Sequence, residues 1–380
     1  MRRTFLLLLS GVTVGLVLPA VTSAGTLNVH AGQSIQQAVN QAHPGDRIFI
    51  GPGVYQERGR PCPTEPGHIC AVAVKKDDIS LIGRPKNNAP VVIENRGGQD
   101  VGISVGRTGD PSCLTDESSR INGSLISDLQ VNGFGDDGVF LFCVDAWRVT
   151  NVQTIDDNEY GIFPSHSGQG RVDNSFASGA NDTGIYIGQS HDVEIDHNTA
   201  TGNVSGFEIE NSTAVTAHDN QSYGNTGGIL SFTLPGLDVT SNHDNDIGNN
   251  NVHDNDKPNT CVDPNDSVCQ VPPGTGILID AADTNNVHQN AVHDNNSFGI
   301  AVANFCTGKP PEACNPPPSD IDIFADGNHI VSNNVTGNGS DPAVDPIFAV
   351  DLAWDTTGTD NCWSGNTFGT SFPSELPPCP

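Results

Sequence analysis

The sequence predicts an all-β protein built as a parallel β-helix, in which short strands stack coil upon coil. Two observations indicate this fold. A glycine followed by alternating apolar residues recurs at steps of 22 or 23 residues, with one longer step of 48. The apolar residues alternate over three or four positions, which is the period of a strand, and each run closes at glycine or asparagine. The motif begins at Gly138, Gly161, Gly184, Gly206, Gly228, Gly276 and Gly299.

The repeat length indicates what each coil contains. A unit of 22–23 residues is too short for two strands and a helix, but it suits three short strands joined by turns. We expect about ten such coils, whose equivalent strands pair in parallel at ~4.8 Å per coil. A second row of residues keeps step with the glycines and should form a hydrogen-bonded ladder from coil to coil. Its members are Asn151, Asn174, Asn198, Asn220, Asn250, Asn290 and Asn333.

The N-terminus predicts export. Two arginines precede an apolar stretch at residues 5–18, and Ala24 lies at a small-residue cleavage site, so residues 1–24 are expected to be a secretory signal. Residues 25–380 then form a single domain, which we expect to be a monomer that is secreted, extracellular or periplasmic. No later stretch approaches the ~18 uninterrupted apolar residues of a membrane span.

The remaining elements are placed by local pattern. Ser34–Val39 is typical of a short amphipathic helix that caps the open end of the stack, and Asp46–Ile50 is typical of a first strand. Longer steps in the repeat predict loops inserted at roughly 232–241, 256–273 and 305–319.

Ten cysteines in an exported chain indicate disulfides, because thiols oxidise outside the cytoplasm. Three pairs each enclose seven residues in proline-rich stretches, and the last two pairs follow by elimination. A zinc–thiolate site would need more closely spaced cysteines or histidines. The predicted pairs are Cys62–Cys70, Cys261–Cys269, Cys306–Cys314, Cys113–Cys143 and Cys362–Cys379.

Composition excludes other classes. The chain has 16 Lys and Arg against 45 Asp and Glu, a net charge of −29, and only 16% charged residues. Helical bundles need more Ala, Leu, Glu and Lys. A surface this acidic, with no basic stripe, would repel nucleic acids.

The segment GQSIQQAVNQAHPGDRIFIGPGVYQE resembles the N-terminal cap and first coil of secreted right-handed parallel β-helix, or pectin-lyase-like, proteins. The segments SGANDTGIYIGQS, GNVSGFEIENS and GNTGGILSFTLPGL resemble blocks of a bacterial β-helix family of exported proteins without an established biochemical role. The resemblance covers nearly the whole mature chain and implies a right-handed helix. A shorter segment, Tyr160–His166, is similar to a motif of alginate C5-epimerases, but Phe163 replaces the aspartate of that motif, so epimerase activity is not implied.

Strand alternation turns the residue after each repeat glycine inward and the next one outward. Residues two positions before the glycines, Asp136, Glu159 and Asp182, should lie beside the same outer face. One outward column contains Phe140, Phe163, Tyr186, Glu208, Leu230, Leu278 and Ala301, and the next contains Phe142, Ser165, Gly188, Glu210, Phe232, Asp280 and Ala303.

This face mixes carboxylates with aromatic rings, a combination that suits a sugar chain, although exposed acids are also typical of plain solvated surface. Glu208 and Glu210 share one strand face with Cβ atoms ~6.5–7 Å apart, close enough for one to raise the pKa of the other. The expected catalytic residues are Asp182, Tyr186, Glu208 and Glu210. The expected substrate-binding residues are Phe140, Glu159, Phe163, His166, Gln189 and Asn211.

Three functions follow as hypotheses. The first is a carbohydrate-active enzyme, a polysaccharide lyase, hydrolase or epimerase, acting on a polysaccharide or oligosaccharide. Because the face offers almost no Lys or Arg, a uronate substrate would need a cation such as Ca²⁺, whereas a neutral sugar would suit hydrolysis. The second is a non-catalytic module that binds a glycan or a protein. The third is a periplasmic metal-binding protein, whose weak candidate ligands are His253, Asp254, His293 and Asp294.

Overall fold

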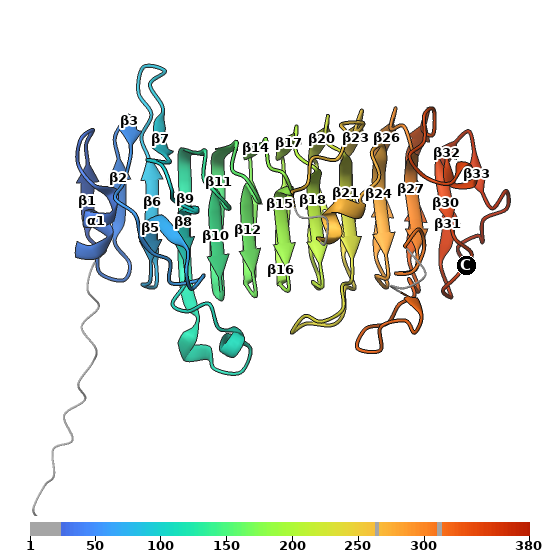
Figure 1. Cartoon of the computed structure of the whole chain (residues 1–380), viewed down its shortest axis with the longest axis horizontal. Helices are drawn as coiled ribbons and strands as arrows, with labels where there is room; N and C mark the ends of the chain where they lie inside the picture. The colour runs from blue at the N-terminus through green and yellow to red at the C-terminus, as the bar shows by residue number, and fades with distance from the viewer. Residues whose placement is uncertain (1–23, 263–265, 310–313) are drawn as a thin grey trace, which may run out of the picture.

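The computed structural model describes residues 24–262, 266–309 and 314–380, and the predicted signal segment lies outside them apart from its last residue. The described chain is an elongated stack of coils that runs from the N-terminal cap to the C-terminus (Figure 1). None of its helices is long and apolar enough to cross a membrane.

The coils contribute to two sheets. The twelve-stranded sheet is parallel except for β4, which pairs with β5 in the antiparallel sense. Its strands are β4 (Arg60–Pro61), β5 (Ile69–Val74), β8 (Val101–Val105), β10 (Val139–Phe142), β12 (Ile162–Ser165), β15 (Thr183–Gly188), β18 (Ser205–Glu210), β21 (Gly227–Phe232), β24 (Thr275–Asp280), β27 (Phe298–Ala303), β30 (Leu352–Trp354) and β33 (Ser371–Phe372).

A second sheet of 21 strands forms the other sides of the stack. Its strands are β1 (Thr26–Val29), β2 (Arg47–Ile50), β3 (Gly53–Tyr55), β6 (Ile79–Gly83), β7 (Val91–Glu94), β9 (Ile121–Asn132), β11 (Val144–Ile155), β13 (Gly168–Asp173), β14 (Phe176–Ser178), β16 (His191–Asp196), β17 (Thr199–Thr201), β19 (Thr216–His218), β20 (Gln221–Tyr223), β22 (Asp246–Gly248), β23 (Asn251–His253), β25 (Asn286–His288), β26 (Ala291–His293), β28 (His329–Val331), β29 (Asn334–Thr336), β31 (Cys362–Ser364) and β32 (Thr367–Phe368).

The predicted capping helix is α1 (Ile35–Gln41). Ser34 is its N-cap, and the Ser34 hydroxyl accepts a hydrogen bond from the Gln37 amide at 3.0 Å. The helix buries Ile35 and Val39 against the first coils. It therefore covers the end of the stack, as a terminal unit of a solenoid must.

The interior is narrow and apolar because inward residues of successive coils pack directly on one another. Ile185 pairs with Phe207 in the next coil, and Ile187 pairs with Ile209. All four side chains are fully buried. A one-residue slip would turn this set outward, so the alternating pattern holds the coils in register.

The asparagine ladder forms, but its first two members differ from the prediction. Asn198 Oδ1 accepts the Ser175 amide at 2.9 Å, and Asn220 Oδ1 accepts the Asn198 amide at 3.0 Å. Ser175 thus holds the ladder position that the sequence assigns to Asn174. Asn151 and Asn174 lie one residue earlier, in left-handed turns with φ of 52° and 51°.

A second ladder has an acid, Asp157, near its N-terminal end. Asp157 aligns with Ala180 and Asn203 at steps of 23 residues, and its Oδ1 accepts the Phe134 amide at 2.9 Å. Asn203 Nδ2 donates to the Ala177 carbonyl oxygen, but Asp157 has an oxygen, Oδ2, in place of that donor and this atom finds no partner. Burial raises the pKa of Asp157 well above its usual range, so the carboxyl holds a proton.

Asp157→Asn is therefore expected to stabilise the protein at pH 8 by about 1–2 kcal/mol, because an amide supplies a donor without the proton uptake that Asp157 needs on folding. A raised folded-state pKa means that the stability contributed by Asp157 is lost as pH rises, so the gain should shrink towards pH 4. Denaturant unfolding at both pH values checks this. A variant that is less stable than wild type at pH 8 would contradict it.

The structure joins the five cysteine pairs that the sequence predicts. Two of them, Cys261–Cys269 and Cys306–Cys314, lie in the insertions predicted at 256–273 and 305–319, and residues of both loops line one pocket on the outer face of the twelve-stranded sheet. Such bonds are compatible with an extracellular or periplasmic location.

Candidate functional site

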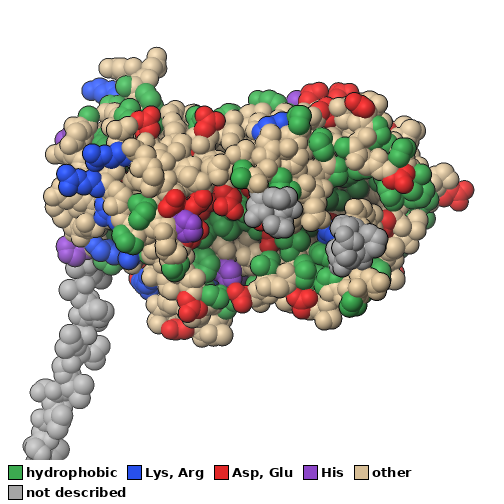
Figure 2. Space-filling model, viewed as in Figure 1, with side chains coloured by type: hydrophobic (Ala, Val, Ile, Leu, Met, Phe, Trp, Pro, Cys, Tyr) green, Lys and Arg blue, Asp and Glu red, His purple; other side chains and the backbone are tan. Residues whose placement is uncertain are grey.

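The outer face of the twelve-stranded sheet carries the two predicted columns. Tyr186 pairs with Glu208 in the next coil, and Glu208 pairs with Leu230. Glu210 lies between Gly188 and Phe232 in the neighbouring column. In-register stacking therefore places three groups in succession along one face: the aromatic row Phe140, Phe163 and Tyr186, the carboxylate pair Glu208 and Glu210, and an apolar stretch that begins at Leu230. Figure 2 shows Asp and Glu side chains gathered beside the hollow in this face.

The aromatic row is a continuous stack, but part of it is covered. The rings of Phe140 and Phe163 lie 4.9 Å apart between centroids, and those of Phe163 and Tyr186 lie 4.5 Å apart. Phe140 is only 4% exposed and packs in an apolar cluster with Cys62, Cys70, Cys113 and Cys143. The structure therefore keeps Phe163 half-buried at the face, whereas the disulfide-bonded cysteines pack around Phe140.

The carboxylate pair is held by its neighbours. Glu210 accepts a hydrogen bond from the Tyr186 hydroxyl on one oxygen and from Gln189 Nε2, at 2.9 Å, on the other. Glu208 is 4% exposed and lies two residues before Glu210 on the same face of β18. Two predicted residues, Tyr186 and Gln189, thus contact Glu210, and Glu208 lies beside them.

Further acids extend this group towards the N-terminal coils. Asp182 lies at the start of β15 and accepts a hydrogen bond from Thr183 at 2.8 Å. The ring of Tyr160 packs on Tyr186 at 4.9 Å, and Glu159 precedes it in the chain. Backbone hydrogen bonds from the Asp182 amide to Glu159 and from the Glu159 amide to Asp136 align these three residues as an acidic run.

The stapled loop between Cys62 and Cys70 completes the run with residues that the sequence did not reveal. His68 Nε2 lies 3.2 Å from Asp136 Oδ2, and Glu65 interacts electrostatically with both. The cysteine spacing identified the loop, but only the antiparallel pairing of β4 with β5 shows that it folds back over the face.

Burial shifts the acids towards their neutral forms. Burial raises the pKa of Glu208 to about 7, and the negative charge of Glu210 adds to this rise. Burial also raises the pKa of Glu210 to about 7, although the hydrogen bond from Tyr186 acts in the opposite direction. Burial and the charge of Glu208 also raise the pKa of Asp182 well above its usual range. The group can therefore hold and release protons near neutral pH.

These shifts predict a pH dependence of stability. Because the pKa of Glu208 and Glu210 rises from 4.5 to about 7 on folding, the stability they contribute is full below pH 4.5 and is lost as pH rises through 7. We expect the free energy of unfolding to fall by about 2–3 kcal/mol per group across this window. Denaturant titrations at pH 5 and 8 check it, with the double variant Glu208→Gln/Glu210→Gln as the flatter control. Equal slopes in both proteins would contradict it.

Two predicted residues have other partners. Asn211 is fully buried, and its Nδ2 donates to the carbonyl oxygens of Leu234 and Val239, so it fastens the loop after β21 rather than facing a substrate. His166 Nδ1 lies 2.8 Å from Ser165 Oγ, and its Nε2 lies 3.7 Å from Asp238. Burial lowers the pKa of His166, so it is neutral at pH 7.

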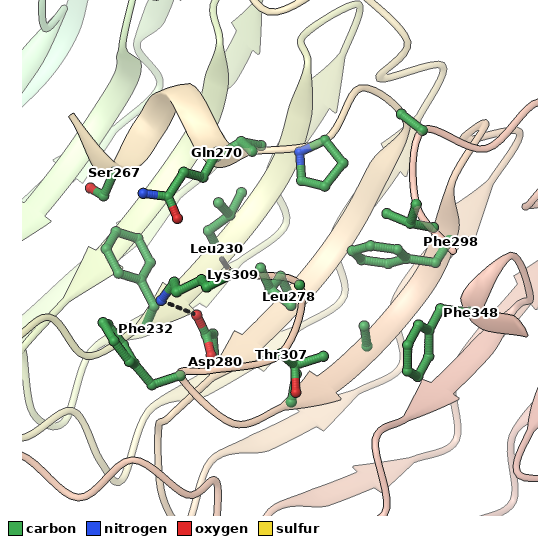
Figure 3. Close-up of a pocket in the computed structure, with 18 of the residues that line it drawn as sticks. Leu230, Phe232, Ser267, Gln270, Leu278, Asp280, Phe298, Thr307, Lys309 and Phe348 are labelled. Atoms are coloured by element: carbon green, nitrogen blue, oxygen red, sulfur yellow. Dashed lines mark hydrogen bonds and ion pairs between the residues drawn. The ribbon is translucent and has the colours of Figure 1, made fainter. Parts of the chain in front are cut away.

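Beyond Glu208 the face becomes an apolar pocket of about 830 Å³. Leu230 and Phe232 of β21 and Leu278 of β24 form its floor, and Phe298 lies on the next strand, β27 (Figure 3). Lys309 Nζ lies 3.5 Å from Asp280 Oδ2, so the charges of this pair offset each other. Glu208 lines the pocket as well, and it therefore stands where the acidic and apolar parts meet.

The predicted histidine pair does not converge on one ion. The rings of His253 and His293 are parallel at 4.9 Å, and each Nδ1 bonds to its own following aspartate. A metal binds in the plane of an imidazole, at about 2.0–2.1 Å for zinc, so rings this far apart cannot share it through their remaining nitrogens.

Another group of possible ligands, Glu194, Asp196 and His218, lies on the second sheet. Arg171 already pairs with both of its acids, with nitrogen–oxygen distances of 3.2 Å to Glu194 and 2.7 Å to Asp196. A resident cation of this kind supplies the positive charge that a metal would bring. Neither group therefore supports a metal centre.

These observations define the class: a parallel β-helix protein with clustered carboxylates and an apolar pocket on the outer face of one sheet. The chain belongs to the family described as the right handed beta helix region, whose model matches residues 114–315. The stack is accordingly right-handed. No curated protein sequence matches the chain.

Solved structures are similar in fold. The mannuronan C-5 epimerase AlgE4 A-module of Azotobacter vinelandii is 14% identical with a TM-score of 0.56, over 88% of this chain and 90% of that one. The periplasmic alginate epimerase AlgG is 14% identical with a TM-score of 0.53, over 92% and 84%. The Dettilon tailspike protein gp208 is 14% identical with a TM-score of 0.55, over 92% and 60%. Identities this low show the fold alone.

Proposed function

We propose that the protein hydrolyses a neutral polysaccharide on the outer face of the twelve-stranded sheet. The acidic run, the pair Glu208 and Glu210 and the apolar pocket would together form the substrate groove. The observation that carries this proposal is the pair Glu208 and Glu210, whose pKa values of about 7 suit one acid and one base at neutral pH. Glu210 accepts hydrogen bonds on both oxygens and is the carboxylate of the pair, so Glu208 holds the proton.

Each group then has a defined role. Glu208 gives its proton to the glycosidic oxygen as the bond from that oxygen to the anomeric carbon breaks. Glu210 either attacks that carbon itself or accepts a proton from the water molecule that attacks it. In both cases water supplies the new hydroxyl group on the anomeric carbon and the proton that returns to Glu208. Tyr186 and Gln189 position Glu210, while the half-buried ring of Phe163 offers a face to a sugar.

Charge supports a neutral substrate. A uronate polymer needs a cation beside each carboxylate. Among the described residues that line the groove, Lys309 is paired with Asp280 and His68 with Asp136. The apolar pocket next to Glu208 likewise favours sugars with uncharged faces or substituents.

A panel of neutral and uronic polysaccharides, incubated with and without a chelator, tests the proposal. We expect new reducing ends from a neutral polymer, with a yield that the chelator does not change. Unsaturated products from a uronic polymer, or activity that needs Ca²⁺, would contradict it. Tight binding without any product after long incubation would show a non-catalytic glycan-binding module instead.

A further inference from the structure

The positive charge of this acidic protein is concentrated at one end. Residues 47–107 hold nine of the 16 lysines and arginines but only six of the 45 acidic residues. In Figure 2 the Lys and Arg side chains gather at the end of the stack that carries α1. Residues 47–107 are far in sequence from Glu208 and Glu210. Their net charge is positive, whereas that of the whole chain is negative.

Three arginines at this end share one polar pocket of about 420 Å³. Arg58 precedes β4, Arg60 lies in it, and Arg96 follows β7. Within the described chain, no carboxylate lies within ion-pair distance of any of the three, although Arg107, Arg120, Arg148 and Arg171 are all paired. Arg58 and Arg96 are exposed and Arg60 is partly buried, so all three positive charges border the pocket without a carboxylate partner among the described residues and are available to an anion.

The one acid in the pocket wall is already engaged. Glu57 Oε2 accepts a hydrogen bond from the Ser34 hydroxyl at 2.6 Å, and Glu57 Oε1 accepts the Ile35 amide at 2.5 Å. Glu57 therefore fixes the start of α1 while it offsets part of the arginine charge. Arg60 makes one hydrogen bond, from a terminal nitrogen to the Arg58 carbonyl oxygen at 3.3 Å, and its Nε is buried without a partner.

We infer that this pocket binds a phosphate group. Three guanidinium groups with one neighbouring carboxylate leave a net charge of about +2, which matches the −1.5 to −2 of a phosphate monoester. Three phosphate oxygens can each accept from a guanidinium, whereas a carboxylate offers two oxygens and a single charge. Gln33 and Gln37 add amide groups to the wall. The phosphate group belongs either to a soluble ester or to a lipid headgroup.

Calorimetric titration of the whole mature protein with inorganic phosphate, glycerol 1-phosphate and acetate tests this. We expect one site that prefers the two phosphates to acetate. Arg60→Gln and Arg96→Gln should each weaken phosphate binding about ten-fold or more. The matched control Arg47→Gln, an exposed arginine in the same charged region but outside the pocket, should change it less than about two-fold.

Sedimentation with vesicles distinguishes the two sources. Binding to phosphatidylglycerol vesicles but not to phosphatidylcholine vesicles, lost in Arg60→Gln, would assign the lipid headgroup. Binding of glycerol 1-phosphate without vesicle binding would assign a soluble ester. If Arg47→Gln and Arg60→Gln weakened phosphate binding equally, or if the protein did not prefer phosphate to acetate, the proposal that this pocket binds a phosphate group would be wrong. Thermal unfolding of each variant verifies that it is folded.

Discussion

Replacing Glu210 with Gln is expected to lower turnover of the neutral polysaccharide by about 10²–10⁴-fold, because the amide cannot accept a proton or attack the anomeric carbon. The fold should remain, since an amide can still accept the Tyr186 hydroxyl on its oxygen. Glu208→Gln is expected to lose a similar factor by removing the acid. Rates measured on the same polymer check both.

The pH profiles should separate the two roles. Wild type is expected to show a bell centred near pH 7, because burial raises the pKa of both carboxyls to about 7. Residual activity of Glu208→Gln should lose the alkaline limb, and that of Glu210→Gln the acidic limb. Asp192→Asn, which changes an exposed acid in β16 of the second sheet, serves as the control. Both groove variants remaining within two-fold of this control would contradict the assignment.

The second large effect is on stability. Asn220→Ala is expected to lower the free energy of unfolding by about 3–5 kcal/mol, because four hydrogen bonds between the Asn220 side chain and buried groups are lost. Asn220 Oδ1 accepts the Asn198 amide at 3.0 Å, and its Nδ2 donates to the Ile195 carbonyl oxygen at 2.9 Å and to Asn250 Oδ1 at 3.0 Å. Denaturant unfolding measures the loss, and hydrogen exchange at the Asn198 amide locates it.

Asn334→Ala is the matched control, since Asn334 is exposed and follows the ladder residue Asn333 directly. Its effect should stay within about 0.5 kcal/mol. Equal stability losses in Asn220→Ala and Asn334→Ala would show that the ladder does not hold the coils together.

Parallel in-register stacking explains why so much of the face could be predicted. A repeat of fixed length converts sequence spacing into spatial neighbours, so the 22-residue step from Tyr186 to Glu208 predicts that they are adjacent, as the structure shows. The same step placed Leu230 beside Glu208. The alternation within each strand then separated the buried Ile209 from the two outward glutamates.

The inserted loops follow no such rule. Nothing in the repeat shows that the loop closed by Cys62 and Cys70 brings Glu65 and His68 to the face, or that it covers Phe140. The ladder shows a smaller failure of the same kind. Asn174 and Ser175 are both good turn residues, and only the hydrogen bond from the Ser175 amide to Asn198 decides between them.

Cleavage of a neutral polysaccharide in water enriched in oxygen-18, followed by mass spectrometry of the products, tests the central claim most directly. Hydrolysis by Glu208 and Glu210 predicts one oxygen-18 atom at each new reducing end, and no such label with the Glu208→Gln/Glu210→Gln variant. An unsaturated end without the label, as a lyase would produce, or a polymer that remains uncut by the wild-type protein, would contradict it.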